Sequence, residues 1–109
     1  MCGITGFLDQ RLRPRAAPEA IVAAMSAALA HRGPDDSGLW SDAEAGIALG
    51  HRRLSIIDLS PAGHQPMSSG DGRYLISYNG EIYNHAELAE RLRQAGVALR
   101  GRSDTEALI

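Results

Sequence analysis

The stretch "AGIALGHRRLSIID", residues 45–58, is the part of the sequence that decides the fold. It is long, apolar and rich in strand-forming residues, so it predicts a strand with at least one covered face. Gly50 lies inside this run and indicates either a bulge or a close approach by another segment. Because side chains alternate along a strand, Arg52 and Arg53 point to opposite faces, and one of them points toward the covered side.

A guanidinium on the covered side needs an anion, because removing its charge from water is costly. The planar fork of arginine matches a carboxylate through two parallel hydrogen bonds. Two explanations remain open at this point: a structural ion pair with Asp58 or Asp36, and a carboxylate supplied by a bound ligand.

Helices and strands are expected on both sides of this stretch. Further strands are predicted at 2–9, 73–78 and 97–100, helices at 18–31 and 84–96, and loops at 31–38 and 58–72. The first helix is expected to bury a face formed by Ile21, Met25, Ala28 and Leu29. Asn84 is expected to cap the second helix, and Gly96 to end it. Ser103 and Glu106 form a capping box that opens another helix. The order predicts an α+β fold.

The composition is that of an ordinary globular domain. The chain has 109 residues, 44% of them apolar and 22% charged, with a formal net charge of −2. This balance offers no electrostatic case for binding nucleic acid or an anionic membrane. The sequence shows neither an apolar run long enough to span a bilayer nor a signal peptide at its start, so a cytoplasmic location is expected.

Cys2 is the one cysteine of the chain, so an intrachain disulfide is excluded. The four histidines are His31, His51, His64 and His85. None of them pairs with another, or with Cys2, at a spacing typical of metal ligands, so no metal site is expected. Removal of Met1 would give Cys2 a free α-amine with a pKa near ~7.7–8.0, which is a suitable base for its own thiol. The simpler alternative is that position 2 merely holds a small residue.

The segment "YNGEIYN", residues 78–84, has two interpretations. Asn79-Gly80 is a strong signal for a two-residue type I′ hairpin turn. The same two residues also offer a side-chain amide and an unhindered backbone N–H, the donors of an oxyanion hole. Glu81 is an acceptor for a substrate ammonium, or a solvated turn residue. Asp104 near the start of the last helix is likewise either an acceptor or a capping residue. Together with Cys2 and an arginine, these groups fit an amino acid with a reactive side-chain carbonyl.

Five motifs, in order, resemble those of a known family. They are "MCGITGF", "HRGPDDSG", "GHRRLSIIDLSPAGHQPM", "YNGEIYNHAEL" and "SDTEALI". They resemble the N-terminal glutaminase domain of glutamine-hydrolysing asparagine synthetases. These enzymes are class II glutamine amidotransferases of the N-terminal-nucleophile hydrolase superfamily. Related amidotransferases share Cys-Gly, an Arg-Gly loop and Asn-Gly, but generally lack the sequence motifs "RLSIIDLS" and "NGEIYNH".

The resemblance implies a fold and a role for each matching residue. The fold would be a four-layer αββα sandwich, with two antiparallel sheets packed between helices. Cys2 would attack the side-chain amide of L-glutamine, and Asn79 and Gly80 would form the oxyanion hole. Arg53 would bind the α-carboxylate, while Glu81 and Asp104 would receive the α-ammonium. The pocket would be lined further by the backbone of Leu54, Ser55, Ile56 and Ile57.

The resemblance also concerns what lies beyond this chain. The family's glutaminase domain continues past residue 109, so residues 1–109 are expected to form part of that domain. A synthetase domain that binds ATP and Mg²⁺ follows it in the family, and the full-length protein is a candidate homodimer. No cofactor is expected in residues 1–109. Three alternatives remain: a glutaminase module serving another acceptor, a non-catalytic glutamine-binding or assembly module, and an inactive truncated product.

Overall fold

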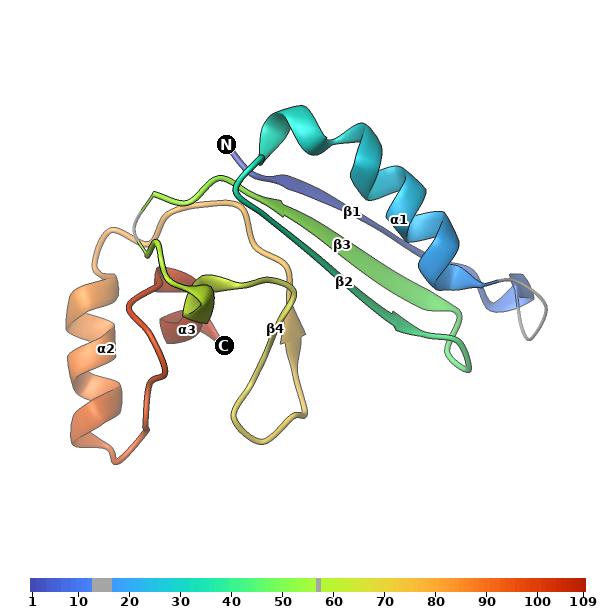
Figure 1. Cartoon of the computed structure of the whole chain (residues 1–109). Coiled ribbons are helices and arrows are strands. Elements are labelled where there is room, and N and C mark those ends of the chain that lie inside the picture. The colour runs from blue at the N-terminus through green and yellow to red at the C-terminus, as the bar shows by residue number, and fades with distance from the viewer. Residues whose placement is uncertain (13–16, 57) are drawn as a thin grey trace.

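The computed structural model describes residues 1–12, 17–56 and 58–109 (Figure 1). Its elements, in order, are β1 (Gly3–Leu8), η1 (Gln10–Leu12), α1 (Pro18–Ala28), η2 (Ala30–Arg32), β2 (Asp36–Asp42), β3 (Ile47–Arg53), η3 (Pro61–Gly63), β4 (Met67–Ser68), β5 (Leu75–Ile76), α2 (His85–Gln94) and α3 (Asp104–Leu108). Within these residues, the strands form one sheet of order β1-β3-β2 and a two-stranded sheet β4-β5. The mixed helix and sheet content is confirmed, whereas the four-layer sandwich stays a prediction.

The stretch that decides the fold forms β3, the central strand. It pairs antiparallel with β1 on one side and β2 on the other, with Gly50 opposite Thr5 and Leu39. The register is continuous through Gly50 on both sides, which excludes a bulge. A Cβ at Gly50 would lie 2.9 Å from the Thr5 Cγ2 and 3.2 Å from a methyl of Val22 on α1. The glycine therefore permits close contact between helix and sheet.

Helix α1 covers one face of the three-stranded sheet (Figure 1). Its buried residues are Pro18, Val22 and Ser26, and Val22 is fully buried with Ala48 of β3. The predicted face is wrong by one position, since Ile21 remains 39% exposed. The close approach over Gly50 explains the shift, because only small or compact side chains fit between helix and strand.

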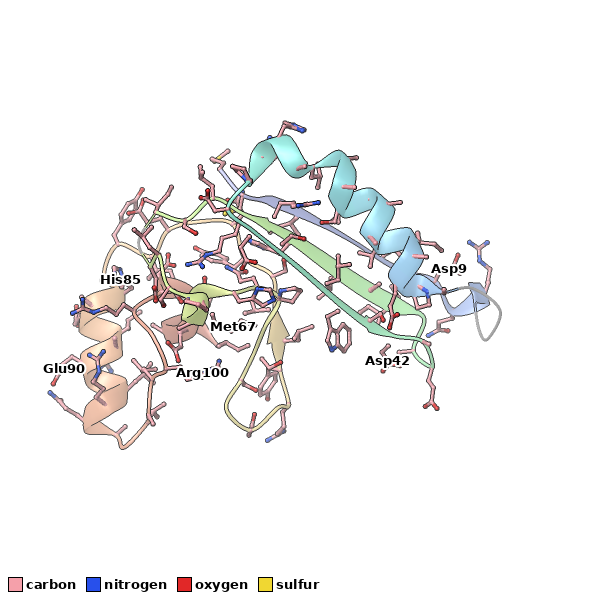
Figure 2. All side chains as sticks on the ribbon, viewed as in Figure 1. Asp9, Asp42, Met67, His85, Glu90 and Arg100 are labelled. Atoms are coloured by element: carbon pink, nitrogen blue, oxygen red, sulfur yellow. The ribbon has the colours of Figure 1, made fainter. Side chains whose placement is uncertain are left out.

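The opposite face of the sheet carries apolar side chains that are exposed. Alternation along the strands places Ile4, Leu8 and Trp40 on this face, and their exposures are 43%, 66% and 37%. Nearer the other end of β3, His51 and Arg53 on the same face are buried. Figure 2 shows Asp9 and Asp42 at one end of the molecule and α2, with His85 and Glu90, at the other; the extents are 46 × 30 × 19 Å.

Several predicted boundaries are wrong. The structure assigns no strand to residues 97–100, it assigns a strand only to Leu75–Ile76 within 73–78, and the predicted loop at 58–72 contains η3 and β4. Residues 36–38, predicted as loop, begin β2. Strand β2 has Ser, Gly and Asp in place of β-branched residues and forms because β3 offers it a full antiparallel partner.

The hairpin predicted at Asn79-Gly80 does not form. A type I′ turn needs positive φ at both residues, and among the described residues only Gly46, Gly72 and Gly96 have positive φ. Side chains from elsewhere hold this segment instead, because Gln65 Oε1 accepts the Tyr78 N–H and Asp104 Oδ2 accepts the Ile82 N–H.

The predictions about the helix caps are confirmed only in part. Asn84 occupies the N-cap position of α2, as predicted, but its side chain makes no capping hydrogen bond. Gly96 follows α2 at φ +86°, as expected of a C-terminal glycine. Ser103 Oγ accepts the Glu106 N–H at 3.2 Å and caps α3. The Glu106 carboxylate accepts hydrogen bonds from the backbone N–H groups of Arg100 and Gly101, so only half of the predicted capping box forms.

Candidate active site

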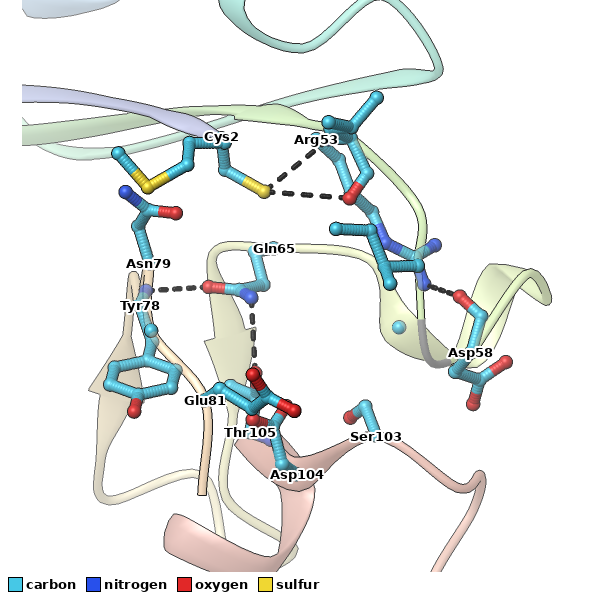
Figure 3. A pocket seen from close by; sticks show the side chains of 15 residues that line it. Cys2, Arg53, Asp58, Gln65, Tyr78, Asn79, Glu81, Ser103, Asp104 and Thr105 are labelled. Atoms are coloured by element: carbon cyan, nitrogen blue, oxygen red, sulfur yellow. Dashed lines mark hydrogen bonds between the residues drawn. The ribbon is translucent and has the colours of Figure 1, made fainter. Parts of the chain in front are cut away.

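A cavity of about 350 Å³ lies where four separate parts of the chain meet (Figure 3). These parts are the residues before β1, the segment from the end of β3 to residue 65, residues 78–81, and the start of α3. The predicted site residues that line it are Cys2, Arg53, Leu54, Ile56, Asn79, Gly80, Glu81 and Asp104. Residues up to 102 positions apart in the sequence are therefore brought around one space.

Two residues that were predicted to line the pocket, Ser55 and Ile57, are not among the described residues that line this cavity. Ser55 lines a second cavity of about 720 Å³, together with Asp35 and His64. Its backbone N–H donates to Asp35 Oδ2 at 2.8 Å, and Asp35 lines the second cavity as well. Ile57 lies outside the described residues.

Cys2 presents its sulfur to the end of β3. Its Sγ accepts the backbone N–H of Leu54 at 3.3 Å and lies 3.7 Å from the Leu54 carbonyl, to which the thiol can donate (Figure 3). Two backbone contacts from one residue therefore fix the sulfur at the cavity wall, beside Arg53. Met1 also lines the cavity, and its side chain is 75% exposed.

Arg53 is 8% exposed, and main-chain carbonyls hold its guanidinium. Its Nη1 donates to the Ser60 carbonyl at 2.9 Å, and its Nη2 donates to the carbonyl of Asp58. Neither predicted ion pair forms: Asp58 meets the guanidinium through its backbone, and the carboxylate of Asp36 pairs with His64 Nδ1 at 2.7 Å. No carboxylate of the described residues lies within ion-pair distance of the guanidinium, so the guanidinium can still bind an anion in the cavity.

The carboxylate of Asp58 is committed to the backbone. It accepts the N–H of Ser60 and the N–H of Arg102, each at 2.8 Å. Hydrogen bonds from Ser60 and from the Arg102 N–H hold the pKa of the Asp58 carboxyl below its usual value. This residue therefore links the loop after β3 to the segment that leads into α3.

Gly63 lies directly against the guanidinium of Arg53. A Cβ at position 63 would overlap Nη2 and Cζ of that side chain. The absence of a side chain in η3 thus lets the guanidinium lie flat against the chain, between the carbonyls that it binds.

Asp104 lies at the start of α3 and is 6% exposed. Its Oδ2 accepts the Ile82 N–H at 3.0 Å, and its Oδ1 accepts the Thr105 N–H at 2.9 Å. Glu81 lines the same cavity and is exposed. The cavity is therefore lined by a guanidinium and, on the side of residues 81 and 104, by two acidic residues.

Gln65, Tyr78 and Thr105 are among the lining residues that were not identified as site residues from the sequence. Gln65 Oε1 accepts the Tyr78 N–H at 2.6 Å, and its Nε2 donates to Thr105 Oγ1 at 3.1 Å. A lone glutamine or threonine carries no spacing signal, so only the fold shows that these residues meet.

His51 is fully buried on β3, two residues before Arg53. Its Nδ1 lies 3.1 Å from Ser77 Oγ, while its Nε2 has no hydrogen-bond partner among the described residues. Burial, with the positive charge of Arg53 as a second cause, lowers the pKa of the imidazole from 6.5 to about 4. The ring is therefore neutral at physiological pH, and it anchors the segment that leads to Tyr78.

The cavity holds the parts of an acyl-transfer site for a zwitterion. A thiol lines a space that is also lined by Asn79 and Gly80, by a guanidinium and by the three acidic residues Asp58, Glu81 and Asp104. Within residues 1–12, 17–56 and 58–109, no group of three His, Cys, Asp or Glu side chains could hold a metal ion. In the same ranges, no helix has the length and apolar character required to cross a membrane.

Comparisons with known proteins find similar sequences that span the whole of this chain. Asparagine synthetase [glutamine-hydrolyzing] 1 of Bacillus subtilis is 43% identical over 110 residues, which cover 100% of this chain and 17% of that protein. Asparagine synthetase [glutamine-hydrolyzing] 1 of Arabidopsis thaliana is 39% identical over 113 residues, covering 99% of this chain and 18% of that protein. Amidase chry2 of Gibberella zeae is 36% identical over 121 residues, covering 100% of this chain and 17% of that protein.

The chain thus spans about a sixth of the length of these relatives. The family described as glutamine amidotransferase domain matches residues 1–109, the whole of the sequence. Together with the ordered motifs, this match shows that the chain belongs to the glutamine amidotransferase domain family.

Proposed function

We propose that this chain is the glutaminase part of an asparagine synthetase. It hydrolyses L-glutamine to glutamate and ammonia, and the longer protein uses the ammonia to make asparagine from aspartate. The observation that carries the proposal is the cavity that gathers Cys2, Arg53, Asn79-Gly80 and Asp104 around one space. Its volume of about 350 Å³ suits a single amino acid.

The proposed substrate orientation follows from charge. The α-carboxylate of glutamine binds Arg53, whose guanidinium faces no carboxylate partner among the described residues. The α-ammonium lies near Asp104 and Glu81 on the other wall. The side-chain amide then extends toward Cys2, with Asn79 and Gly80 beside its carbonyl oxygen.

The proposed reaction begins after Met1 is removed. The α-amine of Cys2 accepts the thiol proton, and Sγ attacks the side-chain carbonyl carbon of glutamine. Asn79 and Gly80 stabilise the negative charge on the oxygen of the tetrahedral intermediate. The protonated amine then donates its proton to the departing nitrogen, so ammonia leaves and a thioester remains. Water hydrolyses the thioester, which releases glutamate and restores the thiol.

Further parts of the proposal concern the longer protein. We infer that a synthetase domain binds ATP and Mg²⁺ there, that residues 1–109 need no cofactor, and that the full-length protein forms a homodimer.

We also infer the four-layer αββα sandwich. The exposed side chains of Ile4, Leu8 and Trp40 support it, because an apolar sheet face packs against a second sheet in such folds. A cytoplasmic location fits a nucleophilic thiol, which a reducing compartment keeps active.

A second candidate is ammonia supply to a different acceptor. The similarity to Amidase chry2 favours it, because that protein shares the same region at 36% identity under a name other than asparagine synthetase. Product analysis with purified full-length protein, glutamine, aspartate and ATP separates the two, since only the first proposal yields asparagine.

The central experiment compares the full-length protein with its Cys2→Ala variant. Intact mass should show that Met1 is removed, and a glutamine-mimicking diazoketone should label Cys2 covalently. The variant should release no glutamate from glutamine, yet should still use added ammonia for the acceptor reaction. Processed wild-type protein that neither is labelled nor releases glutamate would make the chain a non-catalytic binding module.

A further inference from the structure

Gln65 joins two walls of the cavity that are distant in the sequence. It lies between η3 and β4 and is 7% exposed. Its Oε1 accepts the backbone N–H of Tyr78 at 2.6 Å, and its Nε2 donates to Thr105 Oγ1 at 3.1 Å. Figure 3 shows the side chain between these partners, which lie 13 and 40 residues away in the sequence.

The chemistry of the amide suits this position. The Tyr78 N–H can only donate, so the amide oxygen must face it, and the NH₂ group is then directed to Thr105. Thr105 is 3% exposed and Gln65 is 7% exposed, so water does not readily replace either bond. Gln65 therefore satisfies one partner on each wall through opposite ends of a single planar group.

Each partner of Gln65 is adjacent to a residue of the proposed site. Tyr78 precedes Asn79, and Thr105 follows Asp104. The N–H groups of Tyr78 and Ile82 are both held by side chains, so the backbone is fixed on either side of Asn79-Gly80, which restricts where the donors of these two residues can lie. Asp104 adds a second link between the same walls, since its Oδ2 accepts the Ile82 N–H at 3.0 Å. Segments 78–82 and 104–105 are thus joined at two points.

We propose that Gln65 is a positioning residue that sets the separation between the oxyanion donors and the ammonium acceptor. This inference rests on the proposed function. The separation corresponds to the distance from the reacting carbonyl to the α-ammonium, and so to the length of the substrate side chain. Glutamine and asparagine differ in this length by one methylene, and a fixed separation distinguishes them.

The test uses Gln65→Met in the full-length protein, because methionine has a similar length and makes neither hydrogen bond. We expect kcat/KM for glutamine to fall about tenfold or more, the usual effect of one unpaired buried group. We also expect the ratio of the glutamine rate to the asparagine rate to fall. The matched control is Gln94→Met on α2, where the exposed amide only contacts Glu90 at 3.0 Å. The control should behave as wild type.

A second pair of variants keeps the test valid if Gln65→Met folds poorly. Thr105→Val removes only the hydroxyl that accepts from Gln65, whereas Thr105→Ser retains it. We expect Thr105→Val to lower kcat/KM and the glutamine preference, and Thr105→Ser to restore most of both. Iodoacetamide, which needs no substrate pocket, should alkylate Cys2 at the wild-type rate in both variants, while the diazoketone should react more slowly with Thr105→Val.

The outcomes separate this inference from the proposed function. Wild-type kcat, KM and substrate preference in both Gln65→Met and Thr105→Val would overturn the positioning role and leave glutamine hydrolysis standing. Equal slowing of both cysteine reagents would also overturn it, since that result indicates general disruption. Wild-type protein that does not hydrolyse glutamine would overturn both.

Discussion

Arg53 is held in place before any substrate arrives. Two main-chain carbonyls bind its guanidinium, and Gly63 provides the flat surface against which it lies. A side chain that is already ordered loses little conformational entropy on binding a carboxylate. The position of the Arg53 guanidinium therefore depends on Gly63, a residue that has no side chain.

We expect Gly63→Ala to weaken glutamine binding. A methyl at position 63 would overlap Arg53 Nη2 and displace the guanidinium, so KM should rise about tenfold, the usual contribution of a charge-assisted hydrogen bond. Steady-state glutamate release measures both constants, and kcat should change less than KM. Gly70→Ala is the control, because nothing lies within 4 Å of a Cβ there. An unchanged KM in Gly63→Ala would contradict this account of Arg53.

His51 should make stability depend on pH. Its pKa falls from 6.5 to about 4 on folding, so the unfolded state binds a proton at a pH where the folded state does not. Stability is therefore complete above the unfolded pKa and decreases as the pH falls from about 6.5 to about 4, by roughly 3 kcal/mol in total. Below the folded pKa the loss levels off.

Thermal unfolding of wild type and His51→Phe across this pH range measures the effect. The variant lacks the titrating ring, so it should be less stable at neutral pH, through loss of the Ser77 contact, but should lose less stability as the pH falls. Parallel pH profiles for the two proteins would show that another group is responsible.

At the scale of elements, α3 orients Asp104 through its cap. The helix has only 5 residues, and Ser103 Oγ accepts the Glu106 N–H at its start. A helix this short is marginal without such a bond. The Ser103 cap therefore supports the position of Asp104, whose carboxylate is also held by the N–H groups of Ile82 and Thr105.

Ser103→Ala should destabilise this region by about 1 kcal/mol, the usual cost of losing a cap. Because Asp104 and Thr105 follow directly, KM for glutamine should rise as well. Ser103→Thr retains the hydroxyl and should stay close to wild type in both the unfolding midpoint and KM. A KM that rises equally in both variants would argue that the side-chain volume at 103, rather than the cap, is what the site senses.

Regular elements with a strong local pattern could be predicted from the sequence. β3 and β1 have apolar and β-branched residues, and α2 has helical spacing and a C-terminal glycine, so local preference and tertiary packing agree there. β2 was missed because "DSGLWSD" has turn residues, and its pairing with β3 decides its conformation. The Asn79-Gly80 hairpin was wrong for the same reason, since Gln65 and Asp104 hold the flanking backbone.

Only part of the candidate site could be predicted from the sequence. Cys2, Arg53, Asn79 and Asp104 carry chemistry that the sequence displays, and the structure brings them around one cavity, although their roles stay predictions. Gln65 and Thr105 could not be identified, because the importance of each depends on a partner 40 residues away. Long-range hydrogen bonds of this kind leave no periodicity or spacing in a single sequence.

At the scale of the whole molecule, the two faces of the three-stranded sheet differ. Helix α1 covers one face, while Ile4, Leu8 and Trp40 on the other are exposed within the described chain. These apolar side chains, 43%, 66% and 37% exposed, lie on β1 and β2, the two outer strands of the sheet. The proposed second sheet would cover them in the longer protein.

Ile4→Lys in the full-length protein tests this. A lysine buried between two sheets should destabilise the protein by about 3 kcal/mol or more, whereas a solvent-exposed change stays within about 0.5 kcal/mol. Ile21→Lys on the outer side of α1, where Ile21 is 39% exposed, is the control with the same substitution. Similar small shifts in the unfolding midpoints of both would argue against the four-layer sandwich.

The four-part construction of the cavity also has a consequence for the timing of activity during synthesis. None of the four parts forms the cavity by itself. The part made last, residues 103–105, leaves the ribosome about a hundred residues after Cys2. We therefore expect a growing chain to carry its nucleophile for a long time without the means to use it. Under the proposed function, glutamine would be hydrolysed only by molecules in which these distant segments have met, and unfinished chains would release no ammonia.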